Sequence, residues 1–238
     1  MGPSDAGDQR TSAAGDPPLD ALIARDPAHP ALPDALRRSA ERHAHLCPRQ
    51  VLGARLALAG AAALGIALPQ ADKRLIAIVE SDGCFSDGVA VMANCWVGRR
   101  TMRVEDYGRV AATFVDTSDG RAVRVRPQRD VRARVGAWGA AAEGADAAAG
   151  SPRWVGYVLG YQRMPDEELV DVQPVELAAD PRAIVSHPDR RAVCVRCGEE
   201  VSNGREVDGP GGPLCVACAD PARAYYRPRS DGRSSASA

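Results

Sequence analysis

The spacing of apolar residues predicts two helices in the first third of the chain. A short helix is expected over residues 34–42, with Asp34 as its N-cap because it follows a proline. Pro48 disfavours a helical conformation for the residue before it, yet is well tolerated at the first helical position. Cys47 is therefore the predicted N-cap of a second helix over residues 48–65. This helix is apolar almost all round, which predicts a central and buried position.

Runs of apolar and β-branched residues predict strands further along the chain. Residues 73–80 (KRLIAIVE) form the first expected strand, which ends in the turn sequence SDG. A short helix is expected over residues 86–94. Three more strands are expected at 101–105, 110–116 and 121–126, and a hairpin turn joins the last two. This order of helix, strand, helix and three strands predicts an α+β domain with a largely antiparallel sheet.

The remaining segments complete a predicted division of the chain. Residues 127–150 are either helical or a flexible insertion, and a helix near 152–162 and a strand-like stretch at 171–178 follow. The predicted organisation has five parts: a disordered tail over 1–17, the α+β domain over 18–180, a linker over 181–190, a zinc ribbon over 191–222 and a second disordered tail over 223–238.

Composition narrows the classes of function. The 238 residues are 45% hydrophobic, which supports a packed core, and the 30 basic and 31 acidic residues give a net charge of -1. Balanced charge and 4% aromatic residues argue against a nucleic-acid partner or an acidic membrane. The sequence shows neither a signal-peptide pattern nor a stretch of about 18 apolar residues, so a cytoplasmic protein is expected. In that compartment cysteines stay reduced, and the spacing of the seven indicates metal or redox chemistry.

Two cysteine pairs near the end of the chain predict a zinc ribbon. Cys194 and Cys197 form one C-x2-C pair, Cys215 and Cys218 form another, and 17 residues separate the pairs. Each pair aims two thiolates at one ion about 2.3 Å away, and two pairs complete a tetrahedral shell suited to zinc. A closed shell of four cysteines leaves no position for a substrate, so the expected role is structural. Arginines around this module would suit a phosphate-bearing partner, although the neutral charge of the chain favours solvated surface charge.

A second candidate site lies just before the buried helix. His43, His45 and Cys47 alternate, so in an extended segment their side chains would leave the same face and converge on one ion. Two imidazoles and a thiolate suit zinc or another transition metal and leave a coordination position open. The helix N-terminus should also lower the pKa of Cys47. The alternative is that one histidine caps a loop, the other is exposed, and Cys47 is a small buried hydrophobic residue.

Cys84, Asp87 and Cys95 are further candidates. Cys84 and Asp87 follow a strand and a glycine turn, where reactive side chains are commonly presented. Cys84 is either a fourth ligand or a redox partner of Cys47. A continuous helix would place Cys95 about 16 Å from Cys84, too far for one metal, so Cys95 is a weaker candidate and could be a buried structural cysteine.

Together these residues resemble the FmdE family, the E-type component of formylmethanofuran dehydrogenase. That family has the motifs His-Gly-His-x-Cys-Pro-Gly, Cys-x-x-Asp after the first strand, Gly-Cys-x-x-Gly-Lys-Gly and Asp-Tyr-Gly, often with a C-terminal zinc ribbon. The matching segments here are HAHLCP at 43–48, LGAR at 52–55, VESDGCFSD at 79–87, NCWVGR at 94–99 and DYG at 106–108. Ala44 and Arg49 replace glycines, and Arg99-Arg100-Thr101 stands where Gly-Lys-Gly is expected.

The resemblance implies a fold and a site. The implied fold is an α+β domain of the kind also seen in the catalytic domain of glyceraldehyde-phosphate dehydrogenases, often dimeric. The implied site is a metal-binding cavity lined by His43, His45, Cys47, Cys84, Asp87 and Cys95.

Two functions remain open at this point. The first is an accessory protein for metal handling, sulfur transfer or assembly of a metalloenzyme, with the ribbon docking the partner. The second is an enzyme acting on a small molecule, in which a metal at the second site activates water or a carbonyl. Its tentative catalytic residues are Cys47, Cys84 as nucleophile or redox thiol, Asp87 as acid or base, and Cys95. A nucleic-acid adaptor is the least favoured interpretation because the charge is balanced.

Overall fold

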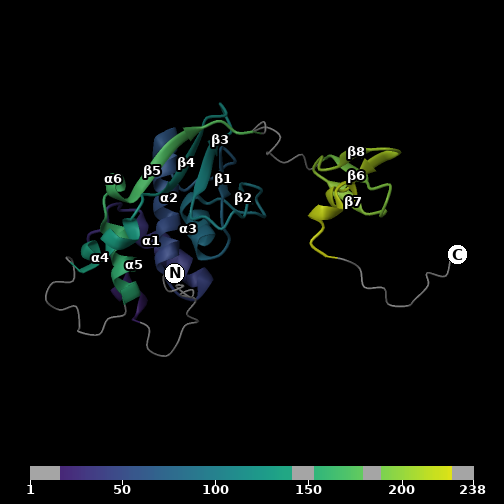
Figure 1. Cartoon of the computed structure of the whole chain (residues 1–238). Helices are drawn as coiled ribbons and strands as arrows, with labels where there is room; N and C mark the ends of the chain where they lie inside the picture. The colour runs from purple at the N-terminus through teal and green to yellow at the C-terminus, as the bar shows by residue number, and fades with distance from the viewer. Residues whose placement is uncertain (1–16, 141–152, 179–188, 227–238) are drawn as a thin grey trace, which may run out of the picture. The chain divides into compact units, whose positions relative to one another are not determined.

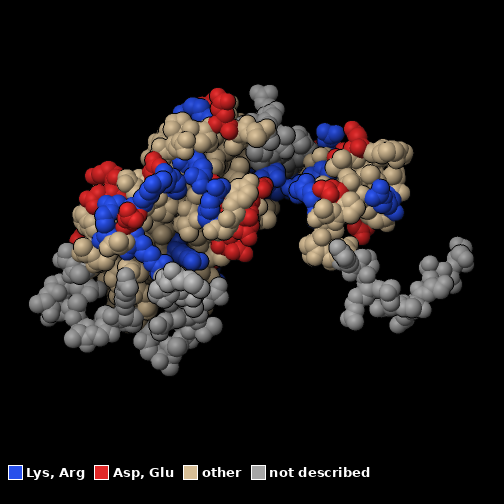
Figure 2. Space-filling view, viewed as in Figure 1, with Lys and Arg blue, Asp and Glu red and all other residues tan. Residues whose placement is uncertain are grey.

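The computed structural model describes residues 17–140, 153–178 and 189–226, which divide into two compact units, 1–182 and 183–238 (Figure 1). Nearly all of the two predicted tails, most of the predicted linker and the second part of the 127–150 segment lie outside the described residues. Lys and Arg are interspersed with Asp and Glu on the surfaces in view (Figure 2). Among the described helices, none combines the length and the apolar character needed to cross a membrane.

The first two long helices follow the prediction closely. Helix α1 spans Leu32–His43 and begins two residues earlier than expected, because Ala31 is its N-cap and Asp34 lies in its first turn. A carboxylate in that turn still interacts favourably with the helix dipole. Helix α2 spans Pro48–Leu64, with Cys47 as its N-cap as predicted, and most of its residues are buried.

A five-stranded sheet confirms the predicted α+β class. Its strands are β1 (Leu75–Val79), β2 (Met102–Val104), β3 (Ala112–Asp116), β4 (Ala122–Pro127) and β5 (Val170–Val175), in the order β2-β1-β3-β4-β5. Strands β1 and β2 are parallel and the other neighbours are antiparallel. Helix α2 packs on the sheet with its Gly60 against Phe114, where an added Cβ would lie 2.2 Å from the ring. The core therefore lies between this helix and one face of the sheet.

The helix after β1 starts earlier than predicted. Helix α3 spans Cys84–Ala93, not 86–94, because Gly83 takes a φ of 76° and turns the chain directly from the strand into the helix. Cys84 therefore occupies the first helical turn. The later helices are α4 (Val131–Ala140), α5 (Arg153–Arg163) and α6 (Asp166–Leu169). The first part of the 127–150 segment is thus helical.

A buried arginine joins α2 to the chain after α5. The fully buried guanidinium of Arg55 donates to the carbonyl oxygens of Tyr161 (2.5 Å) and Met164 (2.6 Å) and to Asp166 Oδ1 (2.6 Å). His29 Nε2 lies 2.9 Å from the other carboxylate oxygen of Asp166. Burial favours a raised pKa for Asp166, but the hydrogen bonds from His29 and Arg55 outweigh it and lower this pKa to about 2. The network holds the helices behind the candidate site in place.

The second unit is built from short strands. Strand β6 (Arg191–Val193) pairs with β7 (Glu200–Ser202), and β8 (Val207–Gly209) pairs with β9 (Gly212–Leu214). A short helix α8 (Val216–Ala219) and a 3-10 turn (Pro221–Arg223) follow. So few apolar residues are buried here, Cys194 and Leu214 among them, that the module needs support beyond its own core.

Candidate functional site

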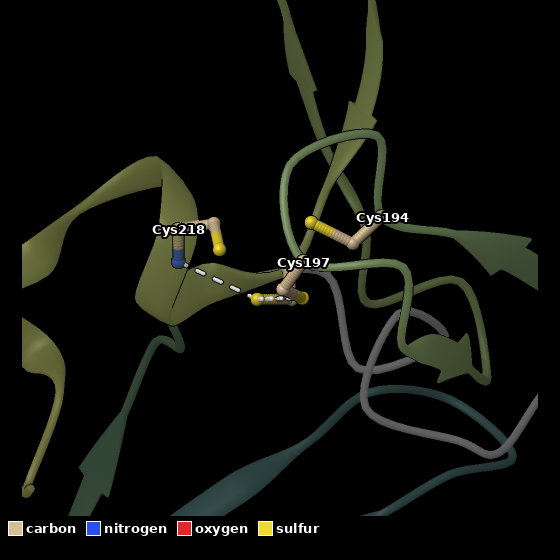
Figure 3. Close-up of side chains that lie close together, drawn as sticks. Cys194, Cys197 and Cys218 are labelled. Carbon is tan, nitrogen blue, oxygen red and sulfur yellow. Dashed lines mark hydrogen bonds between the residues drawn. The ribbon is translucent and has the colours of Figure 1, made fainter. Parts of the chain in front are cut away.

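The predicted ribbon cysteines form one cluster. The sulfur atoms of Cys194, Cys197, Cys215 and Cys218 all lie within 4.8 Å of one another. Cys197 Sγ and Cys215 Sγ are 3.9 Å apart, close to the spacing of about 3.8 Å that follows from four bonds of about 2.3 Å to a tetrahedral ion. The labelled cysteines gather around one centre in Figure 3. This cluster can hold a metal ion, and no other group within the described ranges brings three or more such ligand atoms so close together.

Backbone N–H groups prepare these sulfurs for a cation. The amide of Cys218 donates to Cys215 Sγ at 3.4 Å, and Gly198 closes the first knuckle by donating to the Cys194 carbonyl at 2.9 Å. Amide hydrogen bonds, from Cys197 first, lower the pKa of Cys194 to about 6. A thiolate is the form that binds a metal, so the knuckles favour binding before an ion arrives.

The segment before α2 is not extended, which corrects one sequence prediction. His43 is the last residue of α1, and Ala44 follows with a left-handed φ of 62°. His43 and His45 therefore do not project from a β-like segment. Their rings nevertheless lie together, with centroids 4.6 Å apart, because the left-handed residue reverses the chain. A glycine adopts this conformation without strain, which accounts for the family glycine that Ala44 replaces.

His43 connects two residues of α3. Its Nε2 lies 3.0 Å from Cys84 Sγ and its Nδ1 lies 2.9 Å from Asp87 Oδ2. Cys84 and Asp87 are three residues apart in the first turn of the helix, so both side chains face the end of α1. The carboxylate accepts from Nδ1–H, which leaves the Nε2 lone pair directed at the thiol. The sequence predicted these three residues as candidates, and the structure brings them into direct contact.

Cys47 joins the same cluster from the start of α2. Its thiol shares a hydrogen bond with the Cys84 thiol. This bond, together with His43, lowers the pKa of Cys84 to about 5, whereas the same bond and burial raise the pKa of Cys47. The sequence expectation of a lowered pKa at Cys47 was therefore wrong. The pair holds its negative charge on Cys84 because the imidazole lies on that side.

Cys95 lies apart from the other candidates. Helix α3 is continuous from Cys84 to Ala93, so Cys95 is separated from Cys84 by about 16 Å along the axis. It is buried, and its thiol donates to the Leu75 carbonyl at 3.4 Å. Burial raises its pKa to about 11. These contacts are those of a structural cysteine.

Two glycines set the distance between α2 and α3. A Cβ on Gly53 would lie 2.1 Å from the Phe85 carbonyl oxygen, and a Cβ on Gly88 would lie 2.0 Å from the Gln50 carbonyl oxygen. Neither distance is compatible with a side chain, so the helix backbones are in contact near their first turns. The contact fixes both helix starts, and with them the cysteines they carry.

Gln50 supports the site and was missed among the sequence candidates. Its Oε1 accepts from the Cys47 backbone N–H at 2.7 Å, and the Cys47 side chain in turn faces the N–H of Gln50. This reciprocal arrangement is a capping box, which holds the Cys47 backbone at the helix start. The spacing of N-cap and a glutamine three residues later was the signal available in the sequence.

Comparison with known proteins gives three likenesses. A family model described as "FmdE, Molybdenum formylmethanofuran dehydrogenase operon" matches residues 42–171. A "probable S-adenosyl-L-methionine-binding protein" of Archaeoglobus fulgidus is 31% identical over 209 residues, covering 80% of this chain and 53% of the relative. The chain thus spans about half the length of that protein.

The third likeness is to a solved structure. The crystal structure of an FmdE-like protein from Syntrophus aciditrophicus, named for tungsten formylmethanofuran dehydrogenase, matches with a TM-score of 0.53 and 19% identity. The match covers 85% of this chain and 99% of the other. At this identity the likeness shows the fold.

Proposed function

The chain belongs to the FmdE family, and from that premise we propose that it is a metal-binding accessory protein for a metal-dependent redox enzyme. In this proposal the ribbon holds one zinc ion and stabilises a docking module. A second cluster, called here the front site and made of His43, His45, Cys47 and Cys84, binds another transition-metal ion. The names of the matched family and of the solved relative support a molybdenum or tungsten enzyme as the partner.

One observation carries the front-site proposal: His43 is held by Asp87 at Nδ1 and presents Nε2 to Cys84. Metal-ligating histidines typically donate their other ring N–H to a carboxylate, which fixes the tautomer and makes the ligand more basic. Cys84 and Cys47 add two sulfur donors, and His45 lies against His43. Imidazole and thiolate donors suit zinc, and the half-buried position suits an ion that exchanges with a partner.

The proposal extends to the state of the protein in the cell. Thiolate ligands require a reducing compartment, which supports the cytoplasm as the location. A homodimer is proposed from the resemblance to the family. The name of the Archaeoglobus relative is not carried over, because about half of that protein lies outside the match and can hold its S-adenosylmethionine site.

A second candidate function is an enzyme that uses Cys84 as a nucleophile. The order Cys84, His43 and Asp87, with contacts of 3.0 and 2.9 Å, is that of a nucleophile, its base and the group that orients the base. In this mechanism His43 takes the proton of Cys84, and Asp87 stabilises the resulting imidazolium. The two functions differ in whether the site takes up a metal.

Elemental analysis of the full chain decides between them. Wild-type protein purified in zinc is expected to carry two equivalents of metal, Cys84→Ser and His43→Ala one, and Cys194→Ser only the front-site ion. Cys95→Ala is the matched control and should retain both. If the wild-type chain carries one equivalent and Cys84→Ser loses none, the front site is not a metal site and the enzyme function takes its place.

A further inference from the structure

Two cysteines from separate helices are in contact at the front site. Cys47 caps α2 and Cys84 begins α3, and their thiols share a hydrogen bond although they lie 37 positions apart in the sequence. A disulfide needs the sulfur atoms to approach to about 2.05 Å, which rotation about the side-chain bonds can supply when two thiols already touch.

The surrounding structure keeps this pair in position. The contacts of Gly53 and Gly88 hold the backbones of α2 and α3 together close to both cysteines. The capping box of Gln50 fixes the Cys47 backbone, and the turn at Gly83 fixes the start of α3. The two sulfur atoms are therefore brought together by rigid elements and not by a loop.

We propose that Cys47 and Cys84 are a redox-active dithiol whose oxidation to an intramolecular disulfide switches off metal binding at the front site. Only this consequence for the metal rests on the proposed function, since the disulfide chemistry depends on the two thiols alone. The pair would make the accessory protein responsive to the redox state of its compartment. Reduction would restore both sulfur ligands.

The oxidant is a low-molecular-weight disulfide such as glutathione disulfide. Cys84 passes its proton to His43 Nε2, and its thiolate attacks one sulfur of the oxidant, releasing one glutathione as a thiolate. Cys47 then loses its proton and attacks Cys84 Sγ, which forms the protein disulfide and releases the second glutathione. The two protons lost by the cysteines end on the two glutathione thiols, and two electrons pass from the protein to the oxidant.

Cys84 is assigned the first attack because His43 can accept its proton at 3.0 Å. Cys47 has no such imidazole contact among those described, and its position beside Cys84 suits it to resolve the mixed disulfide. Cys95 lies buried against the Leu75 carbonyl at the other end of α3 and serves as an internal control.

Disulfide mapping tests the switch in the full chain. The protein is equilibrated in buffers of defined glutathione to glutathione disulfide ratio, quenched in acid, alkylated after denaturation, digested and analysed by mass spectrometry. The expected product is one peptide pair linking Cys47 to Cys84 within a single chain, reversed by dithiothreitol, with Cys95 recovered as a free thiol. Recovery of Cys47 and Cys84 as free thiols in the most oxidising buffer, or links only between chains, would overturn the proposal.

Single variants test the order of attack without depending on the cross-link. Cys47→Ser should accumulate a stable glutathione adduct on Cys84, because the resolving thiol is gone, whereas Cys84→Ser should accumulate none on Cys47. The reverse pattern overturns the assigned order. Serine preserves the side-chain volume, and circular dichroism reports whether each variant is folded.

Metal content measured on the same samples separates this inference from the proposed function. The expected result is the loss of one equivalent of metal on oxidation. A cross-link in a protein that binds no front-site metal when reduced would leave the dithiol standing and refute the metal function. Front-site metal without a cross-link would do the opposite.

Discussion

The ribbon cluster and the front site are both built from cysteines, but they are assembled in different ways. In the ribbon each pair of ligands comes from one short knuckle, with two residues between the cysteines. In the front site the end of α1 supplies His43, the start of α2 supplies Cys47 and the start of α3 supplies Cys84. Ligand geometry is thus local in the first case and depends on helix packing in the second.

The comparison also predicts opposite roles for a metal. The ribbon buries little apolar surface, so an ion in its cluster supplies much of the free energy that folds it. The front site lies on a domain whose core is already closed around α2 and the sheet. Loss of an ion there should change the site and leave the fold intact.

The largest expected effect is on the ribbon. Cys194→Ser should abolish metal binding at the cluster and unfold residues of the second unit, while the first unit stays folded. Amide exchange or two-dimensional NMR of the full chain, read together with zinc content, measures both units separately. Asp208→Asn, at an exposed ribbon position, is the control and should change neither. A folded, zinc-loaded Cys194→Ser ribbon would contradict the role assigned to the cluster.

The next effect concerns the contact between α2 and α3. Gly53→Ala places a methyl group 2.1 Å from the Phe85 carbonyl, so the helices must separate, at a cost of about 1–3 kcal/mol in the free energy of unfolding. The Cys47–Cys84 contact should be lost with it. Urea unfolding measures the first result and disulfide mapping the second.

A matched glycine provides the control for this substitution. Gly136 lies within α4, and a Cβ there meets no atom within 4 Å. Gly136→Ala should therefore be neutral or stabilise by up to about 1 kcal/mol, because alanine favours the helix. Equal destabilisation by both changes would show that the α2–α3 contact is not as tight as described.

A smaller effect should appear in the pH dependence of the first unit. Asp166 has a pKa lowered from 3.8 to about 2 by its partners, so its stabilising contribution is present above pH 4 and is lost as the pH falls toward 2. The carboxylate is about one-third exposed, so the contribution is expected to be only about 1 kcal/mol. Urea unfolding of wild type and Asp166→Asn should differ at pH 7 and converge below pH 3. A difference independent of pH would assign the effect to packing.

The smallest effect is expected at Ala44, in the turn that leads to the front site. Its left-handed φ of 62° is strained for alanine, so Ala44→Gly should stabilise the domain by about 0.5–1 kcal/mol. The same change at Ala63, an exposed position within α2, should destabilise by a similar amount because glycine weakens a helix. Urea midpoints of the two variants should therefore move in opposite directions. Movement in the same direction would remove the argument from backbone strain.

The order of elements and several boundaries could be predicted from local patterns. Pro48 identified Cys47 as a helix cap, and β-branched residues identified the strand at 75–79. The helix starts at Leu32 and Cys84 were each misplaced by two residues, because they depend on backbone angles at the flanking residues. Strand order was not predictable either, since the parallel pairing of β1 with β2 is decided by packing.

For the sites, the ribbon follows from local sequence, because four cysteines at C-x2-C spacing can meet only around one small centre. Local sequence also marked His43, Cys47 and Cys84 as candidates. Folding was needed to place Cys84 between His43 and Cys47, and to place Cys95 elsewhere. The pKa of a thiol depends on its neighbours in space, and the neighbours of Cys84 are set by two helices meeting at glycines.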